Sequence, residues 1–236
     1  MFSALITGQR LPAAFEPSPE GELLVVVDPD RSQKLPLSLL HLDYAAAGIL
    51  SLSPHLAEQL DLAADERLDR AELEMRLERA GLELASADHL FHLPLTEQER
   101  LRAEPWGQDT RELSTADADA FDAFTARAPE ADLDEAFVEL DHWLVVGTFR
   151  EGQLVSVASM YPWGETAVAD LGVITLPTFR GQGLGRATVR AISAAALERG
   201  YEPQYRCDLG NAPSAALARA AGFARFGLWE GLEDGD

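Results

Sequence analysis

The sequence predicts an α+β protein in which a sheet is covered by helices and is preceded by a mixed, mostly helical region. Two observations lead to this fold class. Strand and helix patterns alternate from Ser114 to Trp229, whereas leucines at helical spacing dominate the first hundred residues. With 236 residues, 47% of them hydrophobic, the chain is long enough for one large domain or two modest ones with a buried core.

The first hundred residues contain one strand candidate and several helical stretches. The leucine and valine run over 23–27 predicts a short buried strand. A set of leucines recurs among charged residues at roughly helical spacing, and Gly81 offers a stop: Leu56, Leu60, Leu68, Leu73, Leu77 and Leu82. Thr96 and Glu99 have the pattern of a capping box, which predicts a short helix that closes at Pro105.

A change of pattern near residues 104–109 predicts a domain boundary, with one region over 1–105 and a second over 106–236. The second region is expected to contain the following elements: helices over 114–127 and 133–140, strands over 143–150 and 153–160, a strand over 168–175, a helix over 184–199, a strand over 205–209, a helix over 212–221 and a strand over 223–229. Glu151-Gly152 predicts a tight turn between the first two strands.

Charge and cysteine content exclude several classes of protein. The chain carries 40 acidic and 19 basic residues, a net charge of −21, which disfavours binding to a nucleic-acid backbone or to an anionic membrane surface. Cys207 is the only cysteine, so there is no disulfide framework and no cysteine-rich zinc site. Neither a signal-peptide pattern nor a long apolar run occurs, and we therefore expect a cytoplasmic protein.

Metal binding is not expected. Four histidines lack the i, i+4 pairing with an acidic partner that a metal site favours, and packing or surface roles are expected for them: His41, His55, His89 and His92.

The glycine-rich stretch from Arg180 to Arg186 is the most informative part of the sequence. It lies between a strand candidate and a helix candidate, where glycines let backbone amides approach a ligand closely. The helix N-terminus adds unpaired N–H groups, so the stretch predicts an anion site, most simply one for a pyrophosphate. The glycine spacing fits neither the dinucleotide fingerprint nor the P-loop. A glycine turn that only joins strand to helix is the alternative.

The local charge favours the anion site. From Arg180 to Arg206 the chain has five arginines and two acidic residues, a local charge of +3 within a strongly acidic protein. We expect Arg180 and Arg186 to contact phosphate.

Two motifs resemble those of the GNAT superfamily of N-acyltransferases. The acyl-CoA-binding motif of this superfamily is [Q/R]-x-x-G-x-[G/A] after a strand. This motif resembles the stretch Val173-Ile174-Thr175-Leu176-Pro177-Thr178-Phe179-Arg180-Gly181-Gln182-Gly183-Leu184-Gly185. A later motif of the same superfamily resembles the stretch Asn211-Ala212-Pro213-Ser214-Ala215-Ala216-Leu217, which is followed by Gly222-Phe223. The resemblance covers about residues 110–236. The first hundred residues match no family that we recognise.

The resemblance implies a mixed, mostly antiparallel sheet that is splayed at its centre, with the pantetheine arm of acetyl-CoA in the splay. Carried over by position, the backbone of Val173, Ile174 and Thr175 would pair with pantetheine. The amides of Gly181, Gln182, Gly183, Leu184, Gly185 and Arg186 would hold the pyrophosphate. Asn211 would contact the pantetheine arm. The implied reaction is transfer of an acetyl group to a primary amine; the alternative is a non-catalytic acyl-CoA-binding or regulatory module.

The family mechanism can be carried over only in part. Asp170 is the candidate general base, since the family commonly places an acid on this strand, and a solvated aspartate at a strand end is the alternative. The usual acid is a tyrosine directly after Leu217, but this chain has Ala218 there. Tyr205, Tyr161 or a water molecule remain as candidates to protonate the thiolate.

The acceptor is less well defined. Residues 112–141 contain ten acids and one base, which predicts either a cationic acceptor (a polyamine, an aminoglycoside or a protein amino group) or simply a solvated acidic surface. Tyr161 and Trp163 are expected either to stack on a substrate or to cover the sheet edge. The chain is expected to be a monomer or a homodimer.

Overall fold

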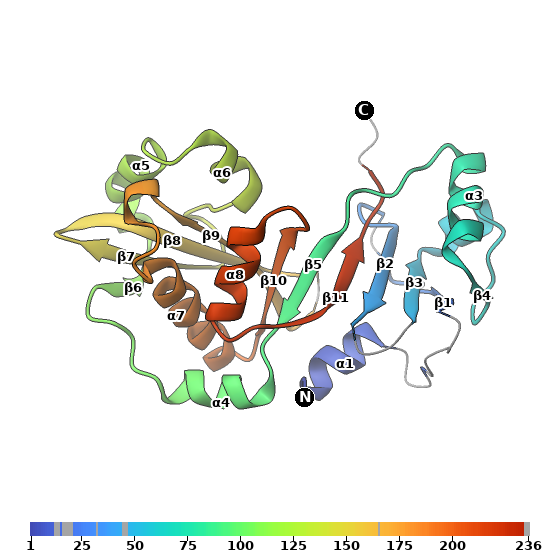
Figure 1. Cartoon of the computed structure of the whole chain (residues 1–236), viewed down its shortest axis with the longest axis horizontal. Helices are drawn as coiled ribbons and strands as arrows, with labels where there is room; N and C mark the ends of the chain where they lie inside the picture. Colours follow the sequence, from blue (N-terminus) through green and yellow to red (C-terminus); the bar gives the residue numbers. More distant parts are fainter. Residues whose placement is uncertain (12–14, 16–20, 32, 44–46, 165, 234–236) are drawn as a thin grey trace. The chain divides into compact units, whose positions relative to one another are not determined.

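A computed structural model describes residues 1–11, 15, 21–31, 33–43, 47–164 and 166–233. The chain divides into two compact units (Figure 1). The larger unit contains residues 1–6, 91–206 and 212–224, and the smaller unit contains residues 7–90, 207–211 and 225–236. Helix α1 (Ala4–Arg10) and strand β5 (Asp88–His92) lie where the chain passes from one unit to the other.

The larger unit is built on β6 (Thr110–Glu112), β7 (Leu144–Arg150), β8 (Gln153–Pro162), β9 (Val168–Thr175) and the first part of β10 (Glu202–Asp208). Their spatial order is β10–β9–β8–β7–β6. Neighbouring strands from β6 to β9 are antiparallel, and β9 is parallel to β10. The predicted turn between β7 and β8 is present: Glu151 and Gly152 both have positive φ, 50° and 78°, as a tight two-residue hairpin requires.

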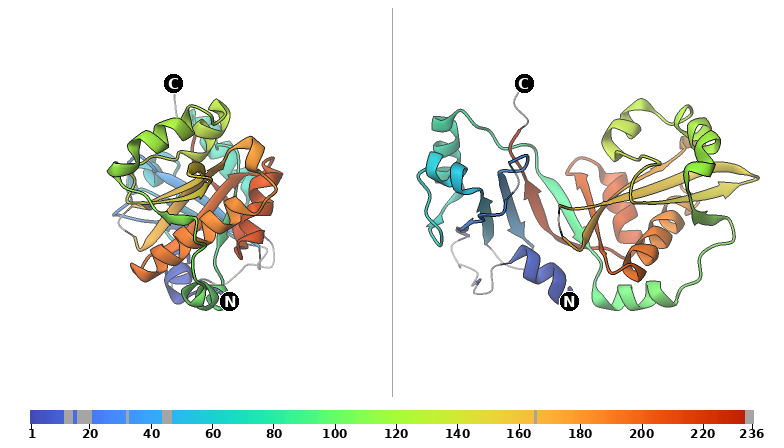
Figure 2. Two further views of the ribbon diagram at one scale, coloured as in Figure 1. Left: turned by 90° about the vertical axis from the view of Figure 1, so that its left-hand side faces the viewer. Right: turned by 180° about the vertical axis from the view of Figure 1, so that it is seen from behind.

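Helices cover both faces of this sheet (Figures 1 and 2). On one face lies α7 (Leu184–Glu198), whose Thr188 hydroxyl bonds the hydroxyls of Ser156 at 3.0 Å and Thr148 at 2.7 Å. On the other face lie α5 (Ala118–Thr125) and α6 (Glu130–Ala136), and Phe124 shares a core there with Val157. Because side chains alternate along a strand, the odd-numbered residues of β8 face α5 and α6.

The pairing of β9 with β10 stops halfway along β9. The register joins Val168–Leu171 to Glu202–Tyr205, whereas Gly172–Thr175 have partners on β8 alone among the described strands. The N–H of Leu176 donates to the carbonyl of Val155 on the β8 side, at 3.0 Å. Since backbone groups alternate in direction along a strand, those of residues 173 and 175 point away from β8. Beyond Leu171, this edge of β9 is therefore paired with no other described strand, and its Thr175 carbonyl accepts a side-chain hydrogen bond from Arg180 Nε.

The smaller unit contains a second set of strands: β1 (Leu23–Val27), β2 (Leu37–Leu42), β3 (Gly48–Leu52), β4 (Arg67–Leu68) and β11 (Ala224–Glu230). Their order is β4–β1–β3–β2–β11. Helices α2 (Pro54–Gln59) and α3 (Arg70–Ala80) add leucines to a core that includes Leu23, Leu50 and Leu73. This region has more strand than the leucine spacing predicted, because alternating leucines also suit a half-buried strand.

Most predicted elements are present with shifted ends. Strand 168–175 is confirmed residue for residue, and Gly81 ends α3 with φ 70°. Helix α8 (Ala212–Ala220) is also present. The predicted capping box at Thr96 was wrong: the N-cap of α4 (Leu95–Ala103) is Pro94, two residues earlier, and no side chain caps this helix.

The helix ends before β7 also differ from those predicted. A capping box forms at Ser114, ahead of the short 3₁₀ turn Thr115–Asp117 that leads into α5. The helix expected over 133–140 is α6, which ends at Ala136 because Phe137 adopts a left-handed conformation. The boundary between residues 105 and 106 remains a prediction.

Gly172 is required where α6 meets β9. A Cβ at this position would overlap the carbonyl oxygen of Ala136, a backbone atom that no side-chain rotation removes. We expect Gly172→Ala to lower the free energy of unfolding by about 1–3 kcal/mol, measured by urea denaturation. Gly107→Ala is the matched control, since its Cβ would only reach ordinary contact with Thr110, at 3.6 Å. Equal stability of the two variants would contradict this account.

Candidate functional site

The glycine loop after β9 is shaped by two left-handed residues. Gly181 has φ 73° and Gly183 has φ 78°, a region that side chains other than glycine rarely adopt. No heavy atom lies within 4 Å of the place where a Cβ would stand on either residue. These glycines therefore serve the backbone conformation and leave the space above the loop open.

Six consecutive amides of this loop are available to a ligand. Within the described part of the chain, no hydrogen bond is donated by the backbone N–H groups from Gly181 through Arg186. Gly183 is the N-cap of α7, whose dipole adds partial positive charge at the same place. The loop thus places these amides at a helix N-terminus, and binding of an anion there stays a prediction.

Gly185 has a different role, because it allows α7 to approach β9 closely. A Cβ on Gly185 would come within 2.8 Å of Thr175 Oγ1, whose hydroxyl in turn bonds Ser156 Oγ at 2.9 Å. This close approach places the N-terminus of α7 next to the end of the unpaired edge of β9. The two parts of the predicted cofactor site, strand edge and amide loop, are therefore adjacent.

The arginines near the loop are mostly held by carboxylates, which reduces the positive charge predicted there. Four of the five form ion pairs: Arg180 with Asp132, Arg190 with Glu104, Arg199 with Glu112 and Arg206 with Asp170. Arg180 Nε also donates to the carbonyl of Thr175, at 2.9 Å. Arg186 is exposed and makes no ion pair with any described residue. Of the two arginines expected to contact phosphate, Arg186 is the one whose charge is not already neutralised.

The second motif has its own contacts. The N–H of Asn211 donates to the carbonyl of Asp208 in the segment just before α8, which groups with the smaller unit, and contact of Asn211 with pantetheine stays a prediction. Ala218 is fully buried. The hydroxyl of Tyr205 lies 2.9 Å from Ser214 Oγ, and the ring packs on Phe223.

Asp170 lies at the centre of a polar cluster on the face of the sheet that carries α5 and α6. Its carboxylate is 5% exposed and accepts hydrogen bonds from Gln204 Nε2 at 2.9 Å, Arg206 Nη2 at 2.9 Å and the Tyr161 hydroxyl at 3.3 Å. The guanidinium of Arg206 also stacks over the ring of Trp163, 4.7 Å from its centroid. Both carboxylate oxygens are therefore occupied, so base action by Asp170 would require displacing one of these donors.

Tyr161 is held in its neutral form by the same cluster. Burial, followed by the negative charge of Asp170, raises the pKa of Tyr161 to about 12. Its hydroxyl is therefore protonated near neutral pH and can act as a hydrogen-bond donor.

Beside this cluster lies an aromatic group that the sequence analysis missed. The rings of Phe137, His142 and Tyr161 contact one another, with centroid distances of 5.1–5.9 Å. Phe137 is 53% exposed, although it has the strained left-handed conformation with φ 46°. His142 Nδ1 lies 2.8 Å from Ser159 Oγ. His142 lies in a segment without motif signals, and only the strand register brings it to the site.

The local environment keeps His142 neutral. Burial lowers the pKa of His142 below its ordinary value of 6.5, and this effect outweighs the opposing charges of Glu139 and Asp141. An unprotonated imidazole is therefore present at neutral pH.

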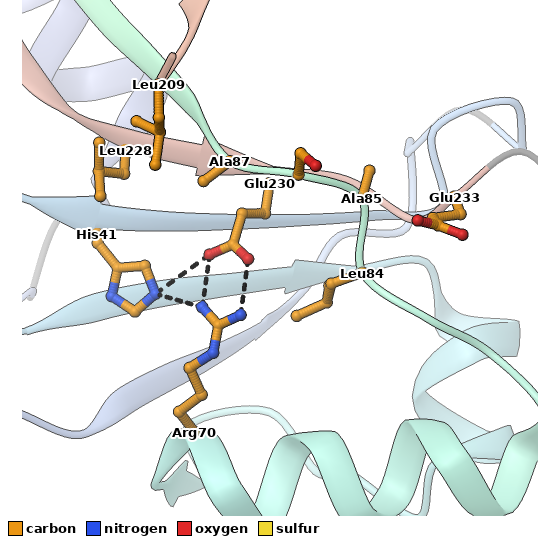
Figure 3. A pocket seen from close by; sticks show the side chains of 10 residues that line it. His41, Arg70, Leu84, Ala85, Ala87, Leu209, Leu228, Glu230 and Glu233 are labelled. Atoms are coloured by element: carbon orange, nitrogen blue, oxygen red, sulfur yellow. Dashed lines mark hydrogen bonds and ion pairs between the residues drawn. The ribbon is translucent and has the colours of Figure 1, made fainter.

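A separate polar cluster belongs to the smaller unit and contains none of the predicted site residues. It borders an open hollow of about 720 Å³, in which the buried carboxylate of Glu230 lies between Arg70 and His41 (Figure 3). Arg70 donates two hydrogen bonds to Glu230, at 2.6 and 2.8 Å, and His41 Nε2 lies 3.5 Å away. These partners satisfy one another, and the cluster is a structural ion pair.

This ion pair makes the stability of the protein depend on pH. Burial alone would raise the pKa of Glu230, but hydrogen bonds from His41 and Arg70 together lower it to about 2. The folded state thus favours the ionised form, and this contribution is present above the ordinary pKa of 4.5 and is lost as pH falls towards 2.

We expect Glu230→Gln to destabilise the fold by about 1–2 kcal/mol at pH 7, because Arg70 loses its buried carboxylate partner but keeps Glu74 and stays partly hydrated. The difference from wild type should vanish near pH 2, as measured by urea denaturation over pH 2–7. Glu233→Gln changes an exposed carboxylate at the same hollow and serves as the control. A difference that does not depend on pH would contradict the assignment.

The described residues contain neither a membrane-spanning helix nor a candidate metal site. No helix of the described residues is both long enough and apolar enough to cross a membrane. Among the same residues, no group of three or more His, Cys, Asp or Glu side chains is placed to hold a metal ion.

Comparison with known proteins points to one family. Residues 108–223 match the model of the acetyltransferase (GNAT) family. No curated protein matches the chain.

Many solved structures resemble the chain, among them the following three. The GNAT acetyltransferase of Colwellia psychrerythraea is 17% identical with a TM-score of 0.50, over 78% of this chain and 75% of that protein, a likeness of fold. A putative GNAT acetyltransferase of Novosphingobium aromaticivorans is 20% identical with a TM-score of 0.47. That match covers 64% of this chain, which spans 66% of that protein's length.

An aminoglycoside N-acetyltransferase solved in complex with CoA is 21% identical with a TM-score of 0.40, over 50% of this chain and 92% of that one. The open, mostly antiparallel sheet flanked by helices, the glycine loop and the family match agree with one another. Residues 108–223 are a domain of the GNAT acetyltransferase family.

Proposed function

We propose that this domain transfers an acetyl group from acetyl-CoA directly to a primary amine of a small molecule or a peptide. The observation that carries the proposal is the row of six free amides from Gly181 through Arg186, next to a strand edge that is unpaired beyond Leu171. A pyrophosphate fits the first feature, and an extended amide-bearing arm fits the second.

The cofactor contacts follow from this arrangement. The loop amides and the Arg186 side chain would bind the pyrophosphate, while Arg180, which already bonds the Thr175 carbonyl, would help to hold the loop against β9. The outward-facing backbone groups of Val173 and the N–H of Thr175 would pair with pantetheine, while the Thr175 carbonyl keeps its hydrogen bond from Arg180 Nε. Ile174, between them, packs its side chain into the core.

The acceptor would bind on the face that carries α6, as a cationic amine. Glu139 and Asp141 are exposed beside the aromatic group, and α6 contributes further exposed acids, among them Asp134 and Glu135. Such a negative surface attracts an ammonium group and raises its local concentration. A polyamine, an aminoglycoside or a peptide amine has this charge.

Direct transfer requires a deprotonated amine, a polarised thioester carbonyl and a protonated leaving thiolate. The amine attacks the carbonyl carbon, a C–N bond forms, and the C–S bond breaks. A thiol near pKa 8.5 leaves without strong acid assistance, so Ala218 in place of the family tyrosine is compatible with transfer. Asp170 and His142 are the two partly or fully buried groups near the site that are candidates to accept the amine proton.

The proposal includes a cytoplasmic location, which agrees with a sequence that contains a single cysteine.

Turnover tests the proposal against the alternative of a non-catalytic acyl-CoA-binding module. With acetyl-CoA and a panel of primary amines, we expect release of free thiol, detected with a thiol reagent, that depends on the amine. Single-turnover mass spectrometry of the acceptor should show one added acetyl group. A chain that binds acetyl-CoA with micromolar affinity, yet releases no thiol with any amine, would support the binding module.

The loop itself is tested by Gly183→Val. The substitution places a side chain in the open space above the amides and disturbs a residue at φ 78°, so we expect acetyl-CoA affinity to fall about 10–100-fold in calorimetric titration. Gly152→Val is a matched control, because Gly152 has the same φ of 78° in the β7–β8 turn and open space around it. Unchanged affinity in Gly183→Val would show that the loop does not bind the cofactor.

A further inference from the structure

We infer that His142 is the residue that takes the proton from the acceptor amine, in a site walled by Phe137 and Tyr161. The inference rests on the acyl transfer proposed above and names the base for it. Five observations carry it: the position of His142 relative to the splay, the orientation of its ring, its protonation state, the walls around it and the occupancy of Asp170.

The strand register places the hydrogen-bond partner of His142 level with the end of the β9–β10 pairing. Its ring nitrogen Nδ1 is hydrogen-bonded to Ser159, and Ser159 lies directly opposite Gly172 in the β8–β9 ladder. Gly172 is the first residue of β9 beyond the pairing with β10. Ser159 is therefore about one strand spacing, roughly 5 Å, from the residue of β9 at which the pairing with β10 ends, and the His142 ring is hydrogen-bonded to Ser159 at that level of the sheet. An extended arm that starts at the glycine loop and follows residues 175 and 173 ends at the same level.

The hydrogen bond to Ser159 also orients the ring. The Ser159 hydroxyl accepts from the N–H of Glu139 at 3.3 Å, which fixes the serine in turn. In the tautomer in which Nδ1–H donates to Ser159, the lone pair on Nε2 is left for the acceptor. The side chain of His142 is 11% exposed, and its Nε2 lies 3.7 Å from the exposed carboxylate of Glu139.

The surroundings suit a base that faces a cation. The charged and titratable groups around His142 are Glu139 and Asp141 on the segment before β7 and Tyr161 on β8. The two carboxylates attract an ammonium group, while the neutral Tyr161 and the exposed ring of Phe137 offer aromatic faces to it. Burial lowers the pKa of His142, so the imidazole is unprotonated near neutral pH.

Asp170 is less suited to the same task. Its two oxygens already accept from Gln204, Arg206 and Tyr161. We therefore assign Asp170 as a positioning residue that holds Tyr161 and Arg206.

The proton balance is complete. As the amine nitrogen bonds to the thioester carbon, its N–H becomes acidic, and His142 Nε2 takes that proton. The C–S bond then breaks, the thiolate takes a proton from water, and the imidazolium returns its proton to water. One proton is released overall when the acceptor starts as an ammonium ion.

The test compares kcat/KM for the amine over pH 5–9 in the wild type, His142→Gln and His142→Ala, with an acceptor identified by thiol release. For the wild type, we expect an acid limb at the pKa of His142, below 6.5, as also measured by histidine-selective NMR titration. For both variants we expect a loss of about 10²–10⁴-fold at pH 7 and a rate that rises with pH towards the pKa of the amine. Added imidazole should partly restore activity to His142→Ala, because the substitution leaves room for it.

Controls separate a chemical role from a structural one. The Kd for acetyl-CoA should stay within about twofold of the wild type in both His142 variants, since this residue lies outside the amide loop. His55→Gln replaces an exposed histidine of α2 and should leave activity unchanged. Ser159→Ala should lower kcat more than it raises KM, because the ring loses its orienting partner.

The outcomes are distinct. A wild type that releases no thiol with any amine overturns the proposed function and this inference with it. An active wild type with His142 variants that keep its rate and acid limb overturns the inference alone. Variants that lose activity but keep the acid limb, with no rescue by imidazole, assign His142 a structural role and also overturn it.

Discussion

The early end of the β9–β10 pairing is the constraint on which the candidate site depends. Parallel pairing stops at Leu171, so the backbone of β9 from Gly172 onward has hydrogen-bonding groups that β10 does not use. Unpaired backbone groups away from water are costly, which makes this edge a natural partner for an extended ligand. The glycine loop follows directly, and Gly185 brings the N-terminus of α7 against Thr175 at the end of the same edge.

Packing on the opposite face depends on the same stretch of β9. Gly172 has no side chain, which lets the carbonyl of Ala136 at the end of α6 approach the strand. The chain then turns at the left-handed Phe137 and leads to His142, which binds Ser159 directly across from Gly172. One short stretch of strand thus arranges the cofactor edge on one side and the proposed acceptor residues on the other.

In the larger unit, the positions of individual charges matter more than the net charge. The arginine-rich segment from Arg180 to Arg206 is largely neutralised by carboxylates from distant parts of the chain, such as Asp132 and Glu104. Arg186 remains without an ion-pair partner among the described residues and lies in the first turn of α7. The acids near His142, by contrast, stay exposed. A helix N-terminus and an arginine thus lie at the amide loop, and exposed acids lie beside the aromatic group, a distribution that agrees with the anionic cofactor and the cationic acceptor proposed above.

Local sequence patterns determined much of the larger unit. Strand 168–175, the hairpin turn at Glu151-Gly152, helix α7 and the amide loop follow from alternation, glycine position and helix periodicity, which are properties of neighbouring residues. The strands over 37–42 and 48–52 were not predicted, because a run of leucines fits either a strand or a helix until its partners are known.

Only the tertiary structure decided the partners of the charged and polar side chains. Asp170 was a candidate base by position, and its saturation by Gln204, Arg206 and Tyr161 depends on three strands lying in register. No sequence motif marked His142, because the role proposed for it depends on a hydrogen bond to Ser159, seventeen residues away along the chain, and on burial that lowers its pKa. Local sequence sets backbone conformation, whereas the chemistry of a side chain depends on neighbours that only the folded sheet brings together.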